Sequence, residues 1–270
     1  MHLSVRRFAA LICCLEAAAC LAAAQSIPKD DIAHIREELG VNDFTAPSIE
    51  IVFRELAELK PIPFDRVWRD LPDATPQDRA RLALGMGAVI ADGFLAVSAE
   101  KQSRIEPVGR VLMKYARGLG VADHVNKHSR SILEKAARQQ WKDIRVELVQ
   151  TQAEVEAAMM GLKDEEIAHL VALGGWLRGL EMTSSIVSEQ YTAEHASRLI
   201  QPELLDYFLD RVSTLNPTLK KTPLVQTIER DLKEVKLVTT HTVEMPIQEA
   251  DVQRIRDLAR EMNRLISSAE

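Results

Sequence analysis

Apolar residues recur along most of the chain at intervals of three and four, the spacing that gives an α-helix one buried face. A clear example is residues 48–59, where one face is formed by Ile49, Val52, Phe53 and Leu56. Proline, glycine and capping residues divide the chain into a series of such segments. We therefore expect helices at residues 28–40, 48–59, 75–99, 106–118, 123–138, 141–162, 164–190, 203–215, 222–238 and 247–267, with a short helix or turn at 64–71 and a short piece after 192.

Three boundaries in this series carry specific signals. Thr75, Pro76 and Asp78 combine an N-cap, a proline at the first helical position and an early acid, so they predict a helix start at Thr75. Pro107 predicts that the following helix starts beside it. Residues 236–242 are rich in β-branched side chains, which favours an extended segment.

Together these segments predict an all-α fold, a multi-helix bundle with little or no β structure. The connections are short, so neighbouring helices should pack antiparallel. We expect residues 25–270 to form a single mature helical domain. The best internal linker candidates, and therefore its soft boundaries, lie near residues 61–76 and 237–246.

Two of the predicted helices are apolar all round, which places them at the centre of the bundle. They cover residues 82–97 and 170–187. Small residues recur in them at intervals of four: Ala83, Gly87 and Ala91 in the first, and Gly175 and Gly179 in the second. Glycine costs a helix interior about 1 kcal/mol relative to alanine. Its use here indicates close helix–helix approach, or room for a ligand against the backbone.

The candidate site residues come from the same two helices. Asp92 and Arg178 are each the only charge in the most apolar stretch of their helix. An isolated charge in a core is costly unless it is paired, so we expect these two to pair, with Glu181 as a nearby third member. The structural interpretation is an ion pair that fixes the helix register. The functional interpretation is a pocket for an anion or another small ligand, closed by Arg178 and Trp176.

The N-terminal segment has the order of a secretory signal peptide. Arg6 and Arg7 precede an apolar run over residues 8–24, which ends in three alanines. Glu16 interrupts this run, and a buried N-terminal helix is the alternative interpretation. The order of basic, apolar and small residues favours export. Residues 1–24 are therefore expected to be a signal peptide, and the mature protein to be periplasmic or secreted.

All three cysteines lie in this predicted leader. Cleavage after Ala24 leaves a mature chain without cysteine, which excludes disulfides and thiolate metal sites from it. The small residues before Cys20 also loosely resemble a bacterial lipoprotein processing site, with Ala17 in place of the usual aliphatic residue. In that alternative Cys20 carries a lipid anchor.

Composition narrows the range of partners. A net charge of −6 and an aromatic content of 4% give no reason to expect nucleic-acid binding or a base-stacking surface. The longest later apolar stretch, residues 82–97, is short for a bilayer and contains Asp92, so no transmembrane span is expected in the mature chain. The expected partner is an unknown protein or a small molecule.

The motifs of known catalytic and cofactor sites are not found in the sequence. His124 and His128 have the i,i+4 spacing that can hold a metal from one helical face, but no further ligand is placed near them, so no metal site is expected. There is no GxSxG motif for a serine nucleophile. The Gly85 to Gly87 segment lies inside a helical pattern rather than after a strand, so no dinucleotide cofactor is expected.

Three functional hypotheses remain. The first is a non-enzymatic, exported helical-bundle protein that serves as a binding or structural component of the cell envelope. The second is a helical enzyme or small-ligand (anion) binder that uses Asp92 and Arg178 in its core. The third is a lipid-anchored scaffold protein. The missing motifs lower the enzyme hypothesis without removing it.

Overall fold

The computed structural model describes residues 50–240 and 246–268. All regular secondary structure in these residues is helical, which confirms the predicted all-α fold. The predicted leader with its cysteines, and the helix expected at 28–40, lie outside the described residues. The helices are α2 (Glu50–Glu58), α3 (Phe64–Val67), α4 (Arg79–Ser98), α5 (Gln102–Leu119), α6 (Ala122–Ala137), α7 (Trp141–Gly161), α8 (Glu165–Glu189), α9 (Ala193–Ser197), α10 (Pro202–Thr214), α11 (Pro217–Lys220), α12 (Pro223–Thr240) and α13 (Glu249–Ser267).

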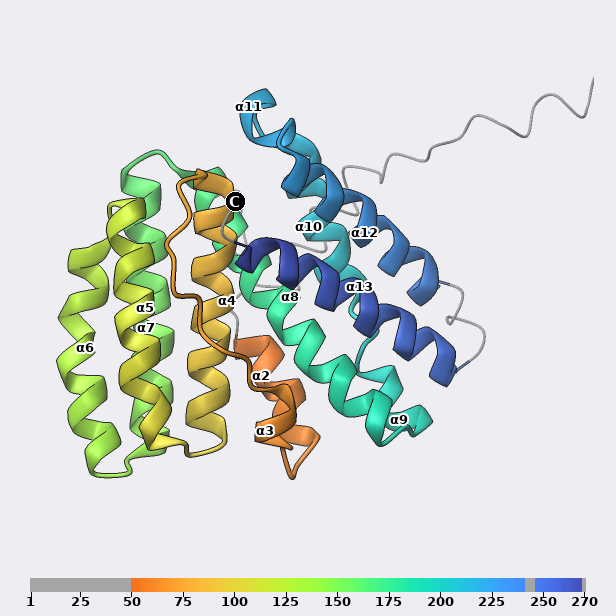
Figure 1. The fold of residues 1–270 in the computed structure, drawn as a ribbon, viewed down its shortest axis with the longest axis horizontal. Coiled ribbons are helices and arrows are strands. Elements are labelled where there is room, and N and C mark those ends of the chain that lie inside the picture. Colours follow the sequence, from red (N-terminus) through yellow and green to blue (C-terminus); the bar gives the residue numbers. More distant parts are fainter. Residues whose placement is uncertain (1–49, 241–245, 269–270) are drawn as a thin grey trace, which may run out of the picture.

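Helices α4, α5, α6 and α7 form a four-helix bundle, because each packs against the next and α7 returns to α4 (Figure 1). Helix α8 has its most extensive contact with α4, and α13 packs against both of them. Helices α12 and α10 continue the layer beyond α13 and α8, while α2 lies against α8 and α4. The two helices predicted to be central, α4 and α8, therefore join the α4–α7 bundle to the C-terminal helices.

Glycines set the close approach of α4 and α8. A Cβ atom added to Gly87 would lie 1.8 Å from the carbonyl oxygen of Val171, and one added to Gly174 would lie 1.9 Å from that of Leu84. These distances leave no room for any side chain, so the two backbones are in direct contact. Sequence spacing identified Gly87 in α4. In α8 the backbone nitrogen of Gly175, which the spacing also identified, would lie 2.6 Å from a Cβ at Gly87, and Gly174, one residue earlier, is a further glycine of this contact.

Helix α4 is a core helix. It is the one helix in the described ranges that is long and apolar enough to cross a membrane, but 89% of its apolar window is buried inside the protein. The main apolar cluster draws on side chains from α2 through to α13, so α4 and α8 lie within one continuous core. Burial of that apolar surface is the main stabilising term for such a core.

Three predicted boundaries were wrong. Helix α4 begins at Arg79, because the side chain of Asp78 accepts a hydrogen bond from the Arg81 backbone N–H at 2.7 Å and so acts as the N-cap in place of Thr75. Helix α5 begins at Gln102, which leaves Pro107 in its second turn, where a proline removes only one early backbone hydrogen bond. Helix α3 ends at Val67, several residues before the expected end at 71.

The expected extended segment at 236–242 is also wrong as far as the structure describes it. Helix α12 continues to Thr240. Val235 and Thr239 are buried on one face of this helix, and the Thr239 hydroxyl donates a hydrogen bond to the Val235 carbonyl at 3.0 Å. Burial on a helical face therefore outweighs the local β propensity. The short helix α11, which the sequence did not predict, follows Asn216, whose side chain caps it.

Candidate functional site

The two core charges singled out by the sequence meet at the contact between α4 and α8. Arg178 Nε donates a hydrogen bond to Asp92 Oδ1 at 2.8 Å, and Arg178 Nη1 donates to Glu181 Oε2 at 2.9 Å. Arg178 Nη2 donates to the backbone carbonyl of Val67 at 2.5 Å. The side chains of Arg178 and Asp92 are 2% and 0% exposed. The structure thus brings three of the predicted site residues together in the core.

Arg69, which the sequence did not single out, completes the arrangement. Its Nε donates to Asp92 Oδ2 at 2.9 Å, and its Nη1 donates to Ser267 Oγ at 2.9 Å. Arg69 lies in the segment between α3 and α4, and Ser267 is the last residue of α13. The buried charge network, defined as Arg69, Asp92, Arg178 and Glu181, therefore fastens this segment and the end of α13 to the two central helices.

The charges of this network balance, since two guanidinium groups face two carboxylates. Burial by itself lowers the pKa of Arg178, but the neighbouring Asp92 and Glu181 outweigh it and raise the pKa above its ordinary value. Both oxygens of Asp92 and all three nitrogens of Arg178 are engaged within the chain. This geometry supports a structural role. The binding of an anion at these residues stays a prediction, which a binding measurement can test.

Trp176 lies apart from the buried charge network. Two residues along an α-helix are separated by about 200° around its axis, so Trp176 and Arg178 point in nearly opposite directions. Trp176 Nε1 donates to Gln201 Oε1 at 2.9 Å, and its ring centroid is 5.3 Å from that of Phe208. Trp176 therefore packs toward α10 and does not adjoin Arg178.

A second buried cluster of polar side chains joins α6 to α7. His128 Nδ1 donates to Glu147 Oε1 and Ser131 Oγ donates to Glu147 Oε2, each at 2.7 Å, and Lys135 also donates to Glu147. Burial by itself raises the pKa of Glu147, but the hydrogen bonds from Lys135, His128 and Ser131 outweigh it and lower the pKa to about 2. Glu147 is thus a carboxylate at neutral pH that holds the two helices together.

The two histidines with metal-like spacing have different surroundings. His128 is buried against Glu147, whereas His124, one turn earlier, is exposed. Within the part of the chain that the structure describes, no group of three or more His, Cys, Asp or Glu side chains is placed to hold a metal ion. The geometry of His128 is that of a side chain in a polar contact between helices.

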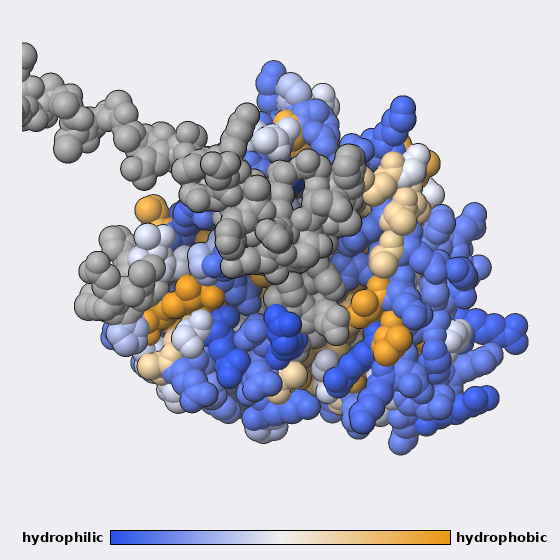
Figure 2. All heavy atoms as spheres, turned by 180° about the vertical axis from the view of Figure 1, so that it is seen from behind, coloured by the Kyte–Doolittle hydropathy of each residue, from blue (hydrophilic) through white to orange (hydrophobic). Residues whose placement is uncertain are grey.

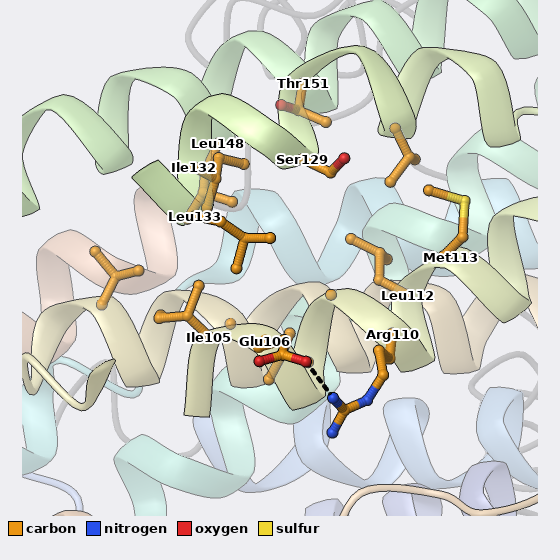
Figure 3. A pocket seen from close by; sticks show the side chains of 15 residues that line it. Ile105, Glu106, Arg110, Leu112, Met113, Ser129, Ile132, Leu133, Leu148 and Thr151 are labelled. Atoms are coloured by element: carbon orange, nitrogen blue, oxygen red, sulfur yellow. Dashed lines mark hydrogen bonds and ion pairs between the residues drawn. The ribbon is translucent and has the colours of Figure 1, made fainter. Parts of the chain in front are cut away.

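An apolar cavity lies inside the α4–α7 bundle (Figure 3). Its volume is about 230 Å³. Gly93 and Val97 reach it from α4, and the other three helices supply the rest of its wall. The apolar lining includes Ile105, Leu112, Met113, Ile132, Leu133 and Leu148. We call this space the bundle cavity. Its mouth lies between α5 and α6, where Leu133 is 44% exposed.

The few polar side chains that line the bundle cavity are already engaged. The hydroxyl groups of Thr151 and Ser129 donate hydrogen bonds to backbone carbonyls of their own helices, at 2.7 and 2.9 Å. At the mouth, Arg110 Nη1 donates to Glu106 Oε1 at 2.5 Å, and both side chains are exposed. The cavity therefore presents a hydrocarbon interior with one ion pair at its margin.

Gly109 of α5 lies at this mouth. A Cβ atom added there would meet nothing within 4 Å, so no neighbouring atom requires a glycine, in contrast to Gly87. A glycine inside a helix costs about 1 kcal/mol relative to alanine. Because Gly109 lines the cavity and its Cβ position is open space, the missing side chain leaves room at the mouth. Sequence reasoning missed this residue, although a glycine within the amphipathic pattern of Ile105, Val108 and Leu112 was an available signal.

On the face shown in Figure 2, the surface that the grey atoms leave in view is mainly hydrophilic, with apolar residues in strips between hydrophilic ones. The exposed large apolar side chains in the described ranges are Leu133, Val146, Leu162 and Leu237. Of these, Leu133 also lines the bundle cavity. At Leu133 exposed apolar surface therefore continues into the interior of the bundle cavity.

Comparisons with protein-family models, with curated proteins and with solved structures give no match. The function is therefore argued from the geometry of the chain itself.

Proposed function

We propose that this chain is an exported helical-bundle protein that acts by binding, and that its ligand is a small, largely apolar molecule held in the bundle cavity. The observation that carries the proposal is an apolar cavity of about 230 Å³ whose mouth is left open by Gly109. An engineered apolar cavity of about 150 Å³ stays dry and binds benzene, so this larger space is sufficient for a ring or a segment of a hydrocarbon chain. Bundle interiors are a recurrent location of ligand sites.

Binding is favoured over catalysis by the lining of the cavity. General acid–base or nucleophilic chemistry needs a titratable or nucleophilic group aimed at the substrate. The lining contains no histidine, cysteine, lysine or aspartate, its one carboxylate, Glu106, lies exposed at the rim, and the hydroxyl protons of Ser129 and Thr151 are donated to backbone carbonyls. The lining therefore offers shape and apolar contact rather than reactive groups.

The proposed location rests on the sequence. Arg6 and Arg7, the apolar run that follows them and the alanines up to Ala24 have the order of a signal peptide. A binding protein in the periplasm or outside the cell must keep its ligand site without disulfides, since the predicted mature chain has no cysteine. The buried charge network and the glycine contact of α4 with α8 supply the rigid platform for the bundle.

Thermal unfolding with decanol as the probe tests this proposal. A ligand that binds only the folded state stabilises it by RT ln(1 + [L]/Kd), which is about 2.7 kcal/mol at a hundredfold excess over Kd. We expect decanol to raise the unfolding temperature of the natural protein. In Gly109→Leu, which places a side chain in the mouth, the shift should be absent.

Gly161→Leu is the matched control. Gly161 is also a helical glycine, at the end of α7, and a Cβ added there likewise meets nothing within 4 Å, but it does not line the cavity. This variant should respond to decanol as the natural protein does. Circular dichroism should show that both leucine variants remain helical. No shift in any of the three proteins, or equal shifts in all of them, would refute the proposed site.

A further inference from the structure

The bundle cavity also indicates the chemical class of its ligand, an inference that rests on the proposed binding function. Inside the cavity, Ser129 and Thr151 already donate their hydroxyl protons to backbone carbonyls. A hydrogen-bond acceptor of a ligand, such as a carboxylate, would lose its hydrogen bonds to water there and find no donor, which is costly, and two hydroxyl oxygens are the only acceptors that the side chains of the interior offer. The part of the ligand that enters is therefore hydrocarbon.

The mouth differs from the interior because it carries a charge pair. Glu106 and Arg110 lie together at one margin of the cavity, away from the apolar side chains (Figure 3). Their side chains are 66% and 64% exposed, and such exposed i,i+4 pairs are weak. An incoming anion can therefore replace Glu106 at the guanidinium group of Arg110 at little cost. Guanidinium groups suit carboxylate and phosphate oxygens because they donate two parallel hydrogen bonds.

One of the two helices that form the mouth, α5, is basic, although the whole chain is acidic. Helix α5 carries one acidic residue, Glu106, and four basic residues: Arg104, Arg110, Lys114 and Arg117. Helix α6 adds little positive charge, because Lys127 and Lys135 are paired with Glu154 and Glu147 of α7. The chain as a whole has a net charge of −6. This local excess of positive charge attracts an anionic ligand and repels a cationic one.

We propose that the bundle cavity binds a free, anionic, single-chain amphiphile of the alkyl carboxylate type. The hydrocarbon chain lies among the apolar residues of the four helices. The carboxylate head stays at the mouth and takes the place of Glu106 at Arg110.

Isothermal titration calorimetry with decanoate and decanol tests this assignment, because the two probes share a chain and differ in the head group. Concentrations are kept below those at which either probe aggregates. We expect Arg110→Gln to weaken decanoate binding by about threefold to tenfold, the range for an exposed charge contact, and to leave decanol binding unchanged. Gly109→Leu should abolish binding of both probes.

Arg130→Gln is the matched control. Arg130 forms an i,i+4 pair with Glu134 on α6, is exposed, and does not line the cavity. Its substitution should leave decanoate binding unchanged. If Arg110→Gln and Arg130→Gln give the same decanoate affinity as the natural protein, the anionic class is wrong while the cavity remains a binding site. If neither probe binds the natural protein, the proposed function fails as well. Sedimentation with phosphatidylglycerol vesicles that persists in Gly109→Leu would also overturn the assignment, because it would place anion recognition on a membrane-facing surface.

Discussion

Single and double substitution of Asp92 and Arg178 measures the contribution of the buried charge network to stability. Asp92→Leu removes the acceptor of two arginines, and leaves Arg178 with Glu181 and the Val67 carbonyl only. Removing one partner of a buried ion pair costs about 3–5 kcal/mol, because an uncompensated charge stays behind. We expect the upper part of this range for Asp92→Leu. For Arg178→Met we expect the lower part, about 3 kcal/mol, since Arg69 still pairs with Asp92.

The double variant should cost less than the sum of the two single variants. It leaves Arg69 and Glu181, whose side chains are 19% and 18% exposed, so both can turn toward water. Residues in direct contact within one network typically couple by about 0.5–3 kcal/mol, and we expect a value of about 2–3 kcal/mol for this buried pair. The exposed pair of Glu106 and Arg110 is the matched control, with an expected coupling of about 0.5 kcal/mol or less.

Urea unfolding followed by far-ultraviolet circular dichroism gives these free energies, provided that the slope with denaturant is the same in all variants. Additivity of the two single variants, to within about 0.5 kcal/mol, would refute the reasoning. The anion hypothesis for Asp92 and Arg178 is tested on the same samples. Phosphate stabilises folded proteins in general because it is excluded from their surface, so the double variant is the reference. If the hypothesis holds, the gain in stability from sodium phosphate over sodium chloride of equal ionic strength should be larger in the natural protein than in the double variant. The closed geometry of the network leads us to expect the same gain in both.

Three further predictions concern other parts of the chain. N-terminal sequencing of the protein from its envelope fraction should begin at Gln25, and an intact Met1 would contradict export with cleavage. Gly87→Ala should destabilise by about 1–3 kcal/mol because its Cβ meets the backbone of α8, whereas Gly161→Ala should be neutral or slightly stabilising; equal effects in urea unfolding would contradict the glycine contact. Burial raises the pKa of Glu156 to about 7 despite a hydrogen bond from Gln152. Ionisation of Glu156 therefore opposes folding. The cost in free energy of folding is absent below pH about 4.5 and is fully present above pH about 7. Glu156→Gln should thus stabilise the protein by about 1–3 kcal/mol near pH 8 and leave its stability unchanged near pH 4. A gain that does not change with pH would contradict this assignment.

The central helices could be predicted because their signals extend over many residues. The apolar stretches of α4 and α8 are too long and too uniform for surface helices, and their glycines indicate close approach. The position of a helix boundary can depend on a single hydrogen bond, so boundaries are harder to predict from sequence than the helices themselves. Thr75 and Asp78 are both suitable N-caps, and only the structure shows that Asp78 reaches the Arg81 N–H.

The candidate site was predictable in part. The pairing of Asp92 with Arg178 follows from the cost of burying a charge and requires no knowledge of the fold. Arg69 could not be found in this way, because it lies in a segment without periodic structure. The misplacement of Trp176 arose from neglecting helical geometry, since residues two apart do not share a face.

The bundle cavity could not be predicted at all. A cavity depends on how the side chains of four helices fit together, and no single helix carries that information. Gly109 alone gives a weak signal, because an exposed glycine inside a helix also occurs without any function. The open space around its Cβ position depends on how α5 lies against its neighbouring helices.

The hydrogen bonds at the end of α13 affect the order in which this protein can fold. Arg69 and Arg81 bind Ser267 and Ser268, across 198 and 187 residues of the sequence. A chain that is synthesised from its N-terminus contains α4 and α8 well before α13, so their apolar surfaces and the charge of Asp92 lack part of their cover until α13 has been synthesised. The core around α4 and α8 can therefore be completed only after α13 has left the ribosome. Until then the chain is an incompletely folded polypeptide that exposes apolar surface.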